Sequence, residues 1–194
     1  MRLFVAIALP GPVTGALEEA VAPLRPAWPE LRWTGRDAWH LTLSFLGEVD
    51  DRVAVKLERR LANAAARHPQ LRLSLDGAGA FPSTARAQVL WAGVTGDRRG
   101  LARLAATVSA AARRAGVAPS DGRHYQPHVT LARCREPADA RPLLADLAGY
   151  AGQEWTAREI YLIHSRLGSE PRYVTLGSWP LRAPEPAGYS RSAT

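Results

Sequence analysis

A short pattern occurs twice in this chain, first as WHLTL at residues 39–43 and again, 88 residues later, as PHVTL at residues 127–131. In both copies a histidine and a threonine stand two positions apart among apolar residues. Side chains two apart on a β-strand point to the same side, so each copy predicts a strand with one polar face and one apolar face. The repetition predicts two similar halves that face each other across a cleft.

Strict alternation along the first copy predicts a polar face of His40, Thr42 and Ser44, with Leu41, Leu43 and Phe45 anchored in the core. In the second copy the same rule places Val129 and Leu131 in the core. Burying imidazoles and hydroxyls without partners is costly. The polar faces are therefore expected to line an open cleft or to meet polar partners.

Outward from the two copies, short apolar strands alternate with amphipathic helices. Hydrophobic spacing and turn residues predict strands at Leu3–Leu9, Trp39–Leu46, Leu71–Leu75, Val89–Val94, His128–Ala132, Glu159–Leu167 and Tyr173–Trp179. They predict helices from Pro12 to about Arg25, from an N-cap at Asp50 and Asp51 to about Arg67, from Leu101 to near Gly116, and around Ala138–Ala148. Hairpin-like pairs indicate antiparallel sheets, so the predicted class is α+β.

Two imidazoles on opposite walls of one cleft suit proton transfer at a phosphorus centre. A histidine titrates near neutral pH, so His40 and His128 could serve as acid and base in either order. The Thr42 and Thr130 hydroxyls could donate hydrogen bonds to a phosphate held between them. His68, His124 and His164 have no comparable setting and are interpreted as structural or surface residues, although His124 lies near enough to the second copy to reach the cleft.

The sequence resembles the 2H phosphoesterases, specifically the bacterial and archaeal RNA 2′,3′-cyclic phosphodiesterases, also called 2′-5′ RNA ligases. The matching segments run in the expected order from about residue 1 to 182. They are RLFVAI at 2–7, RW at 32–33, HLTLSFLGE at 40–48, VLWAG at 89–93, PHVTLAR at 127–133, and Ser165-x-Leu167 followed by Tyr173.

The resemblance implies two lobes related by a pseudo-twofold axis, each a small antiparallel sheet with outer helices, around a central cleft. It implies hydrolysis of a 2′,3′-cyclic phosphate to a 2′-phosphate without metal or nucleotide cofactor. By position, His40 matches the proton donor to the leaving 3′ oxygen, and His128 matches the base that activates water. Thr42 and Thr130 match the phosphate-binding hydroxyls.

Two more residues are candidates for substrate binding. Arg133 follows the second copy directly and could contact phosphate or RNA, or be a solvated arginine at a strand end. Tyr125 could stack on a base, although packing against its own loop is an alternative. The chain departs from its relatives at Gln88, where they often carry an arginine; Arg86 stands two residues earlier.

The charge of the chain suits a polyanionic partner. Basic residues outnumber acidic ones by 25 to 18, and Lys56 is the only lysine. Arginine keeps its charge at any working pH and grips phosphate through a planar fork. RNA or nucleotides with 2′,3′-cyclic phosphate ends are the expected partners, although an arginine-rich surface without any ligand would explain the composition equally well.

Three other functions compete with hydrolysis. A zinc hydrolase usually needs three protein ligands, and no third histidine or carboxylate stands in a matching context; the lone Cys134 cannot build a cysteine site. A non-catalytic RNA-binding module would explain the arginines but not the two matched strands. ATP-independent 2′-5′ RNA ligation could use both histidines at the same site, because only the nucleophile differs.

The sequence predicts one bilobal domain over residues 1–183 and a disordered tail over 184–194, which is rich in Pro, Gly, Ser and Ala. The apolar run at Leu3–Leu9 is too short for a signal peptide or a membrane span. A cytoplasmic monomer that does not associate with membranes is expected.

Overall fold

One antiparallel sheet runs through the whole structure, a computed structural model that describes residues 1–119, 125–166, 168 and 172–184. Its strands follow the order β7-β4-β5-β6-β3-β1-β8-β9, and β2 pairs with β6 outside this path. The strands are β1 (Arg2–Ala8), β2 (Arg32–Trp33), β3 (His40–Glu48), β4 (Leu71–Phe81), β5 (Ala87–Gly96), β6 (His128–Ala138), β7 (Trp155–Ala157), β8 (Glu159–Ser165) and β9 (Tyr173–Pro180). The predicted α+β class with antiparallel pairing is confirmed.

The sheet order is symmetric about the boundary between β3 and β6. The first half of the chain supplies β1, β3 and β4, and the second supplies β5, β6 and β8 in the same order. The third strand of each half pairs with the first strand of the other, β4 with β5 and β8 with β1. The predicted pseudo-twofold lobes are therefore confirmed, and their sheets join edge to edge through β3 and β6.

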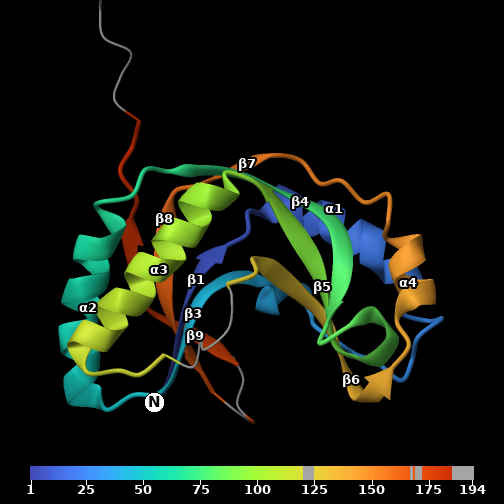
Figure 1. Cartoon of the computed structure of the whole chain (residues 1–194), viewed down its shortest axis with the longest axis horizontal. Coiled ribbons are helices and arrows are strands. Elements are labelled where there is room, and N and C mark those ends of the chain that lie inside the picture. Colours follow the sequence, from blue (N-terminus) through green and yellow to red (C-terminus); the bar gives the residue numbers. More distant parts are fainter. Residues whose placement is uncertain (120–124, 167, 169–171, 185–194) are drawn as a thin grey trace, which may run out of the picture.

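The helices cover the outside of the curved sheet in two pairs. They are α1 (Gly11–Val21), α2 (Asp51–Ala65), α3 (Arg98–Ala115) and α4 (Arg141–Asp146), with 3₁₀ turns η1 (Ala22–Leu24), η2 (Arg36–Ala38) and η3 (Thr84–Arg86). Figure 1 shows α2 and α3 at one side of the molecule and α1 and α4 at the other. The concave side of the sheet between them is left uncovered by helices.

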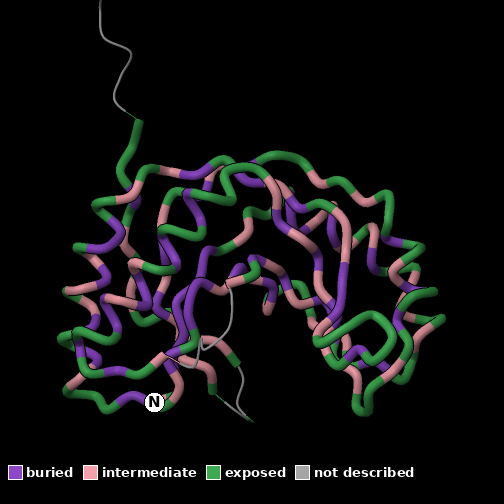
Figure 2. Tube along the Cα trace, viewed as in Figure 1, coloured by how far each residue is buried: buried purple, intermediate pink, exposed green. Residues whose placement is uncertain are grey.

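Apolar faces on strands and helices hold this arrangement together. Leu57 and Leu61 of α2 and Leu101 and Leu104 of α3 are completely buried, as their helical spacing requires. Buried segments follow the central strands and alternate with exposed ones along α2 and α3 (Figure 2). Asp50 caps α2 as predicted, because its side chain accepts a hydrogen bond from the Arg52 amide at 2.8 Å.

Several predicted boundaries are wrong. The first helix ends at Val21, and η1 continues the chain to Leu24. β4 extends to Phe81, because the register shift after Leu75 lets the strand pass Gly77 and resume pairing. β6 runs to Ala138, where a helix was expected to begin, and β7 was not predicted. Residues 169–171, between the last two predicted strands, lie outside the described residues, as does the predicted tail at 184–194 except for its first residue.

Candidate active site

The two repeated motifs lie on neighbouring strands at the centre of the sheet. β3 and β6 pair in antiparallel orientation at Leu41 and Val129. Antiparallel register then makes His40 the neighbour of Thr130, and Thr42 the neighbour of His128. Such neighbours have Cβ atoms roughly 4.5–5.5 Å apart. The two motifs thus place four polar side chains at the corners of a square on the concave face of the sheet.

A β-bulge interrupts each motif strand at the same position. Ser44 pairs with Val5 while Thr42 pairs with Ala6, so Leu43 has no residue opposite it. In the other half Ala132 pairs with Leu90 and Thr130 with Trp91, which leaves Leu131 as the extra residue. After each bulge the side chains exchange faces, since two consecutive residues now point to the core.

The bulges correct the prediction for Ser44 and Phe45. Phe45 was expected in the core, but its side chain is 45% exposed and lines the cleft. Ser44 was placed on the polar face, but it is 1% exposed and its hydroxyl accepts a hydrogen bond from Ser109 of α3 at 3.0 Å. The equivalent bulge in β6 turns Arg133 into the cleft.

Both histidine rings hydrogen-bond to the carbonyl two residues before them. His128 Nδ1 lies 2.7 Å from the Gln126 carbonyl oxygen, and His40 makes the corresponding bond to the backbone of Ala38. A carbonyl can only accept, so Nδ1–H of His128 is the donor. In the neutral ring the Nε2 atom is then the acceptor, ready to take a proton.

Aromatic rings enclose each histidine. The His40 ring lies 4.6 Å from the Phe4 ring and 5.3 Å from Tyr173, which it meets edge to face. The His128 ring meets Phe81 edge to face at 5.0 Å, with Trp91 at 6.3 Å. These contacts hold both imidazoles in place and exclude water from one side of each ring.

Burial dominates the titration of both histidines. The pKa of His40 is lowered from 6.5 to about 4, mainly by burial; the hydrogen bond to Ala38 raises this pKa, and the positive charges of His128, Arg172 and Arg133 also lower it. The pKa of His128 is also lowered, mainly by burial and then by Arg133. Both rings are therefore neutral at pH 7 before an anion binds.

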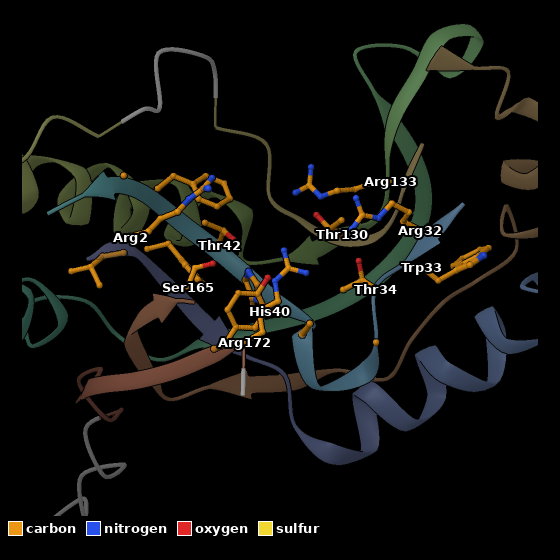
Figure 3. Close-up of a pocket in the computed structure, with 17 residues that line it drawn as sticks. Arg2, Arg32, Trp33, Thr34, His40, Thr42, Thr130, Arg133, Ser165 and Arg172 are labelled. Carbon is orange, nitrogen blue, oxygen red and sulfur yellow. The ribbon is translucent and has the colours of Figure 1, made fainter. Parts of the chain in front are cut away.

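A cavity of about 490 Å³ opens beside the motifs. It is lined by Arg2, Leu3, Phe4, Arg32, Trp33, Thr34, Gly35, Ala38, His40, Thr42, Phe45, Gly47, Thr130, Arg133, Ser165, Arg172 and Tyr173 (Figure 3). None of these lining residues is acidic, and four are arginines. The cavity therefore favours an anion.

The loop before the first motif forms one rim of this cavity, and α1 holds the loop in place. Arg36 Nε donates to the Thr14 hydroxyl at 2.9 Å, and Arg36 Nη2 donates to the Gly11 carbonyl at 2.9 Å. These bonds fix η2 directly before His40. The wall formed by Thr34, Gly35 and Ala38 is thus tied to a helix.

The predicted site residues come together to different extents. His40, Thr42, Thr130 and Arg133 all line the cavity. His128 is not among the lining residues, although Thr130, two residues further along the same strand, is. The His128 ring is half-buried against Phe81 and Trp91.

Tyr125 is also absent from the described lining of the cavity. Its hydroxyl donates to the Thr42 carbonyl at 3.1 Å, which ties the approach to the second motif to the strand of the first. His68 bonds Thr107 of α3 at 2.9 Å, away from the cleft. His124 lies outside the described residues.

Sequence reasoning missed the other arginines of the cavity. Arg2, Arg32 and Arg172 come from three distant parts of the chain. Arg2 and Arg32 stand in segments that carry the family resemblance, which was the signal that could have found them. Arg172 stands outside those segments, and the pairing of β1 with β8 and of β8 with β9 brings it to the cleft.

Neither a metal-binding cluster nor a membrane-spanning helix is found in the described part of the chain. Within these residues, no three His, Cys, Asp or Glu side chains gather in a way that could hold a metal ion. None of the helices there is both long and apolar enough to cross a membrane.

The sequence and the fold are both similar to known proteins. Residues 13–168 match the family described as the 2′-5′ RNA ligase superfamily. An RNA 2′,3′-cyclic phosphodiesterase of Escherichia coli K12 is 34% identical over 183 residues, which cover 93% of this chain and 96% of that protein.

Two solved structures have a similar fold over nearly their whole length. The crystal structure of TT0787 of Thermus thermophilus matches with a TM-score of 0.77 and 29% identity, covering 94% of this chain and 99% of that one. Escherichia coli LigT in complex with 3′-AMP matches with a TM-score of 0.73 and 29% identity, covering 93% and 96%.

Proposed function

The chain belongs to the 2′-5′ RNA ligase superfamily, and from this premise we propose that it hydrolyses RNA 2′,3′-cyclic phosphates to 2′-phosphates without a metal ion. The observation that carries the proposal is the central square, in which two motif strands paired at Leu41 and Val129 bring two histidines and two threonines onto one face. The name of the Escherichia coli relative, an RNA 2′,3′-cyclic phosphodiesterase, supports the substrate class.

The reaction needs one group that accepts a proton from the attacking water and another that donates a proton to the leaving oxygen. His128 Nε2 accepts a proton from water as the water oxygen forms its bond to phosphorus. His40 donates a proton to the 3′ oxygen as the bond between that oxygen and phosphorus breaks. The product is a 2′-phosphate monoester with a free 3′-hydroxyl, and proton exchange with solvent restores the two histidines.

The phosphate needs hydrogen bonds and positive charge while charge builds on its free oxygens. The Thr42 and Thr130 hydroxyls can donate to these oxygens from opposite corners of the square. Arg133 acts on the titration of both histidines and so lies near the space between them. A bound phosphate anion opposes the effect of burial, because it favours the protonated form of His40.

Tyr125 was predicted to bind substrate by stacking, and its hydrogen bond to the Thr42 carbonyl favours a positioning role instead. Through this bond, Tyr125 ties the segment just before His128 to the strand that carries His40 and Thr42. We propose that Tyr125 affects substrate binding indirectly, by positioning Thr42.

The histidine pair is tested by substitution. His40→Ala and His128→Ala should each lower kcat by roughly 10²–10⁴-fold, the usual contribution of a general acid or base, while circular dichroism shows a folded protein. His68→Ala is the matched control, because His68 contacts α3 away from the cleft. A folded His40→Ala or His128→Ala variant with near-normal turnover would exclude the two-histidine mechanism.

The same assay tests the absence of a catalytic metal. Hydrolysis of 2′,3′-cyclic nucleotides should survive exhaustive EDTA treatment, since no ligand set for a metal ion is found in the described residues. Activity that disappears in EDTA and returns with Zn²⁺ or Mn²⁺ would contradict metal-independent catalysis.

Ligation is the second candidate function, favoured by the description of the family. A 5′-hydroxyl RNA end in place of water would give a 2′-5′ linkage at the same phosphorus. Incubating a cyclic-phosphate RNA with a 5′-hydroxyl RNA and separating the products by size measures both outcomes at once. We expect hydrolysis to dominate, and the histidine variants to lose both reactions together.

A further inference from the structure

The cavity carries more positive charge than one cyclic phosphate can balance. Arg2, Arg32, Arg133 and Arg172 all line it, and among the described residues none of the four forms an ion pair with a carboxylate. A 2′,3′-cyclic phosphate is a monoanion. Four guanidinium groups, in a cavity lined by no carboxylate among the described residues, therefore suit a substrate with additional negative charge.

The four arginines form two groups. Arg32 of β2 pairs directly with Arg133 of β6, although like charges placed opposite each other on a sheet repel. An anion between the two side chains would relieve this repulsion. Arg133 lowers the pKa of both histidines, whereas Arg172 acts on that of His40. We therefore assign the pair of Arg32 and Arg133 to the reacting phosphate, which lies between the two rings.

The second group lies at the adjacent ends of three strands. Leu3 pairs with His164 and Ser165 pairs with Tyr173, which brings Arg2, Ser165 and Arg172 to one edge of the cavity. Figure 3 shows Arg2 and Ser165 on one side of His40, and Arg32 and Arg133 on the other. The two groups therefore flank the reacting centre.

An aromatic contact fixes the second group relative to His40. The Arg172 guanidinium lies 5.4 Å from the centre of the Tyr173 ring, in a cation–π arrangement. Tyr173 in turn meets the His40 ring edge to face at 5.3 Å. Tyr173 thus contacts both Arg172 and His40 and holds Arg172 beside His40, a position suited to a phosphate next to the reacting one.

We propose that Arg2, Ser165 and Arg172 bind the phosphodiester that joins the terminal nucleotide to the rest of the RNA, so that a chain of at least two nucleotides is the preferred substrate. This inference rests on the proposed function. Two guanidinium groups and a hydroxyl can each donate to the non-bridging oxygens of this second phosphate.

Three substrates separate the charge of the second phosphate from the rest of the added nucleotide. They are adenosine 2′,3′-cyclic phosphate, an adenylyl dinucleotide that ends in a cyclic phosphate, and the same dinucleotide with a neutral methylphosphonate linkage. The charged dinucleotide should have a kcat/KM about tenfold or more above both others, since hydrogen bonds to charged groups are strong. Equal values for the charged and neutral dinucleotides would overturn the proposal.

Variants assign the effect to residues. Arg2→Gln, Arg172→Gln and Ser165→Ala should each lower kcat/KM for the charged dinucleotide several-fold more than for the mononucleotide or the neutral dinucleotide. Arg59→Gln, which removes an exposed arginine from the outer helix α2, is the control for general charge. Equal losses on all three substrates would instead assign these residues to the reacting phosphate and overturn the subsite.

Salt dependence gives a second readout. For single strands, each phosphate contact adds about 0.7 to the slope of log affinity against log salt concentration. The arginine variants should lose about this much slope on the charged dinucleotide. If the wild-type protein hydrolyses none of the three substrates, the proposed function itself fails; if it hydrolyses the mononucleotide equally well, only the subsite fails.

Discussion

At the scale of single residues, the threonines test whether hydrogen bonding or shape matters at the central square. Thr42→Val and Thr130→Val keep the β-branched shape and remove the hydroxyl. If both hydroxyls stabilise charge that builds on the phosphate, each change should lower turnover by about tenfold or more, around 1–3 kcal/mol. If both variants equal the wild-type protein in thermal stability and in turnover, the threonine hydroxyls do not act on the phosphate and the two side chains serve packing alone.

The pH dependence of the reaction follows from the buried histidines. The proposed mechanism needs one ring protonated and the other neutral. In the free protein the pKa of His40 is lowered to about 4, and that of His128 is lowered from 6.5. The pH optimum of kcat/KM should therefore lie below 6.5, with a decline as the pH rises above it. A cyclic phosphodiester stays a monoanion over this range, so the decline belongs to the enzyme.

A bound phosphate shifts this profile in the opposite direction. Its negative charge favours the protonated imidazole, so the optimum of kcat should lie at higher pH than the optimum of kcat/KM. Initial rates from pH 4 to 9, at low and at saturating substrate, measure both profiles. A kcat/KM that peaks above pH 7 would show that burial does not set the pKa values of His40 and His128.

The residue scale also shows what the sequence could and could not predict. The motifs identified His40, Thr42 and Thr130 as cleft residues, because strand alternation holds over those three positions. It failed at Ser44 and Phe45, since a bulge depends on the partner strand and not on the strand itself. Arg172 could not be found from spacing, because the long-range pairing of β1 with β8 brings the hairpin of β8 and β9 to the cleft.

At the scale of elements, the packing of β4 against β5 positions His128. Gly79 of β4 pairs with Trp91 of β5, and a Cβ atom at Gly79 would lie 2.3 Å from two carbon atoms of the Trp91 indole. The indole occupies the space that any other side chain would need. Trp91 in turn contacts Phe81, and both rings lie against His128.

Gly79→Ala should therefore move the indole and disturb His128 without touching the cleft directly. We expect a loss of about 1–3 kcal/mol in unfolding free energy, the usual cost of overpacking, together with a lower kcat. Gly149→Ala is the matched control, since a Cβ atom there would meet nothing within 4 Å. Thermal unfolding and turnover decide the outcome, and a Gly79→Ala protein equal to wild type in both would contradict this packing role.

Element boundaries were predicted less well than element types. The helices over residues 51–65 and 98–115 were expected from their apolar spacing and caps, and both are present. β7 is three residues long, too short to give a pattern, and exists because Leu71–Leu73 offers it a partner strand. The extension of β6 to Ala138 likewise depends on its pairing with Ala87.

At the scale of the whole molecule, the pseudo-twofold symmetry raises the question of which way the substrate binds. The central square alone looks the same from either half, because each half supplies one histidine and one threonine. The surroundings differ: after the equivalent bulges one half presents Phe45 and the other Arg133. Arg2, Ser165 and Arg172 add donors beside His40.

This asymmetry should select one orientation of the cyclic phosphate and therefore one product. The resemblance to the family implies that His40 stands behind the 3′ oxygen. Under the proposed mechanism, His40 would then protonate that oxygen while water prepared by His128 attacks from the opposite side. The phosphate then stays on the 2′ position. Complete digestion of a 2′,3′-cyclic nucleotide, followed by chromatography or ³¹P NMR against both monophosphate standards, should give the 2′-phosphate. A predominant 3′-phosphate would mean that the two histidines exchange roles, and an equal mixture would mean that the differences between the lobes do not orient the substrate.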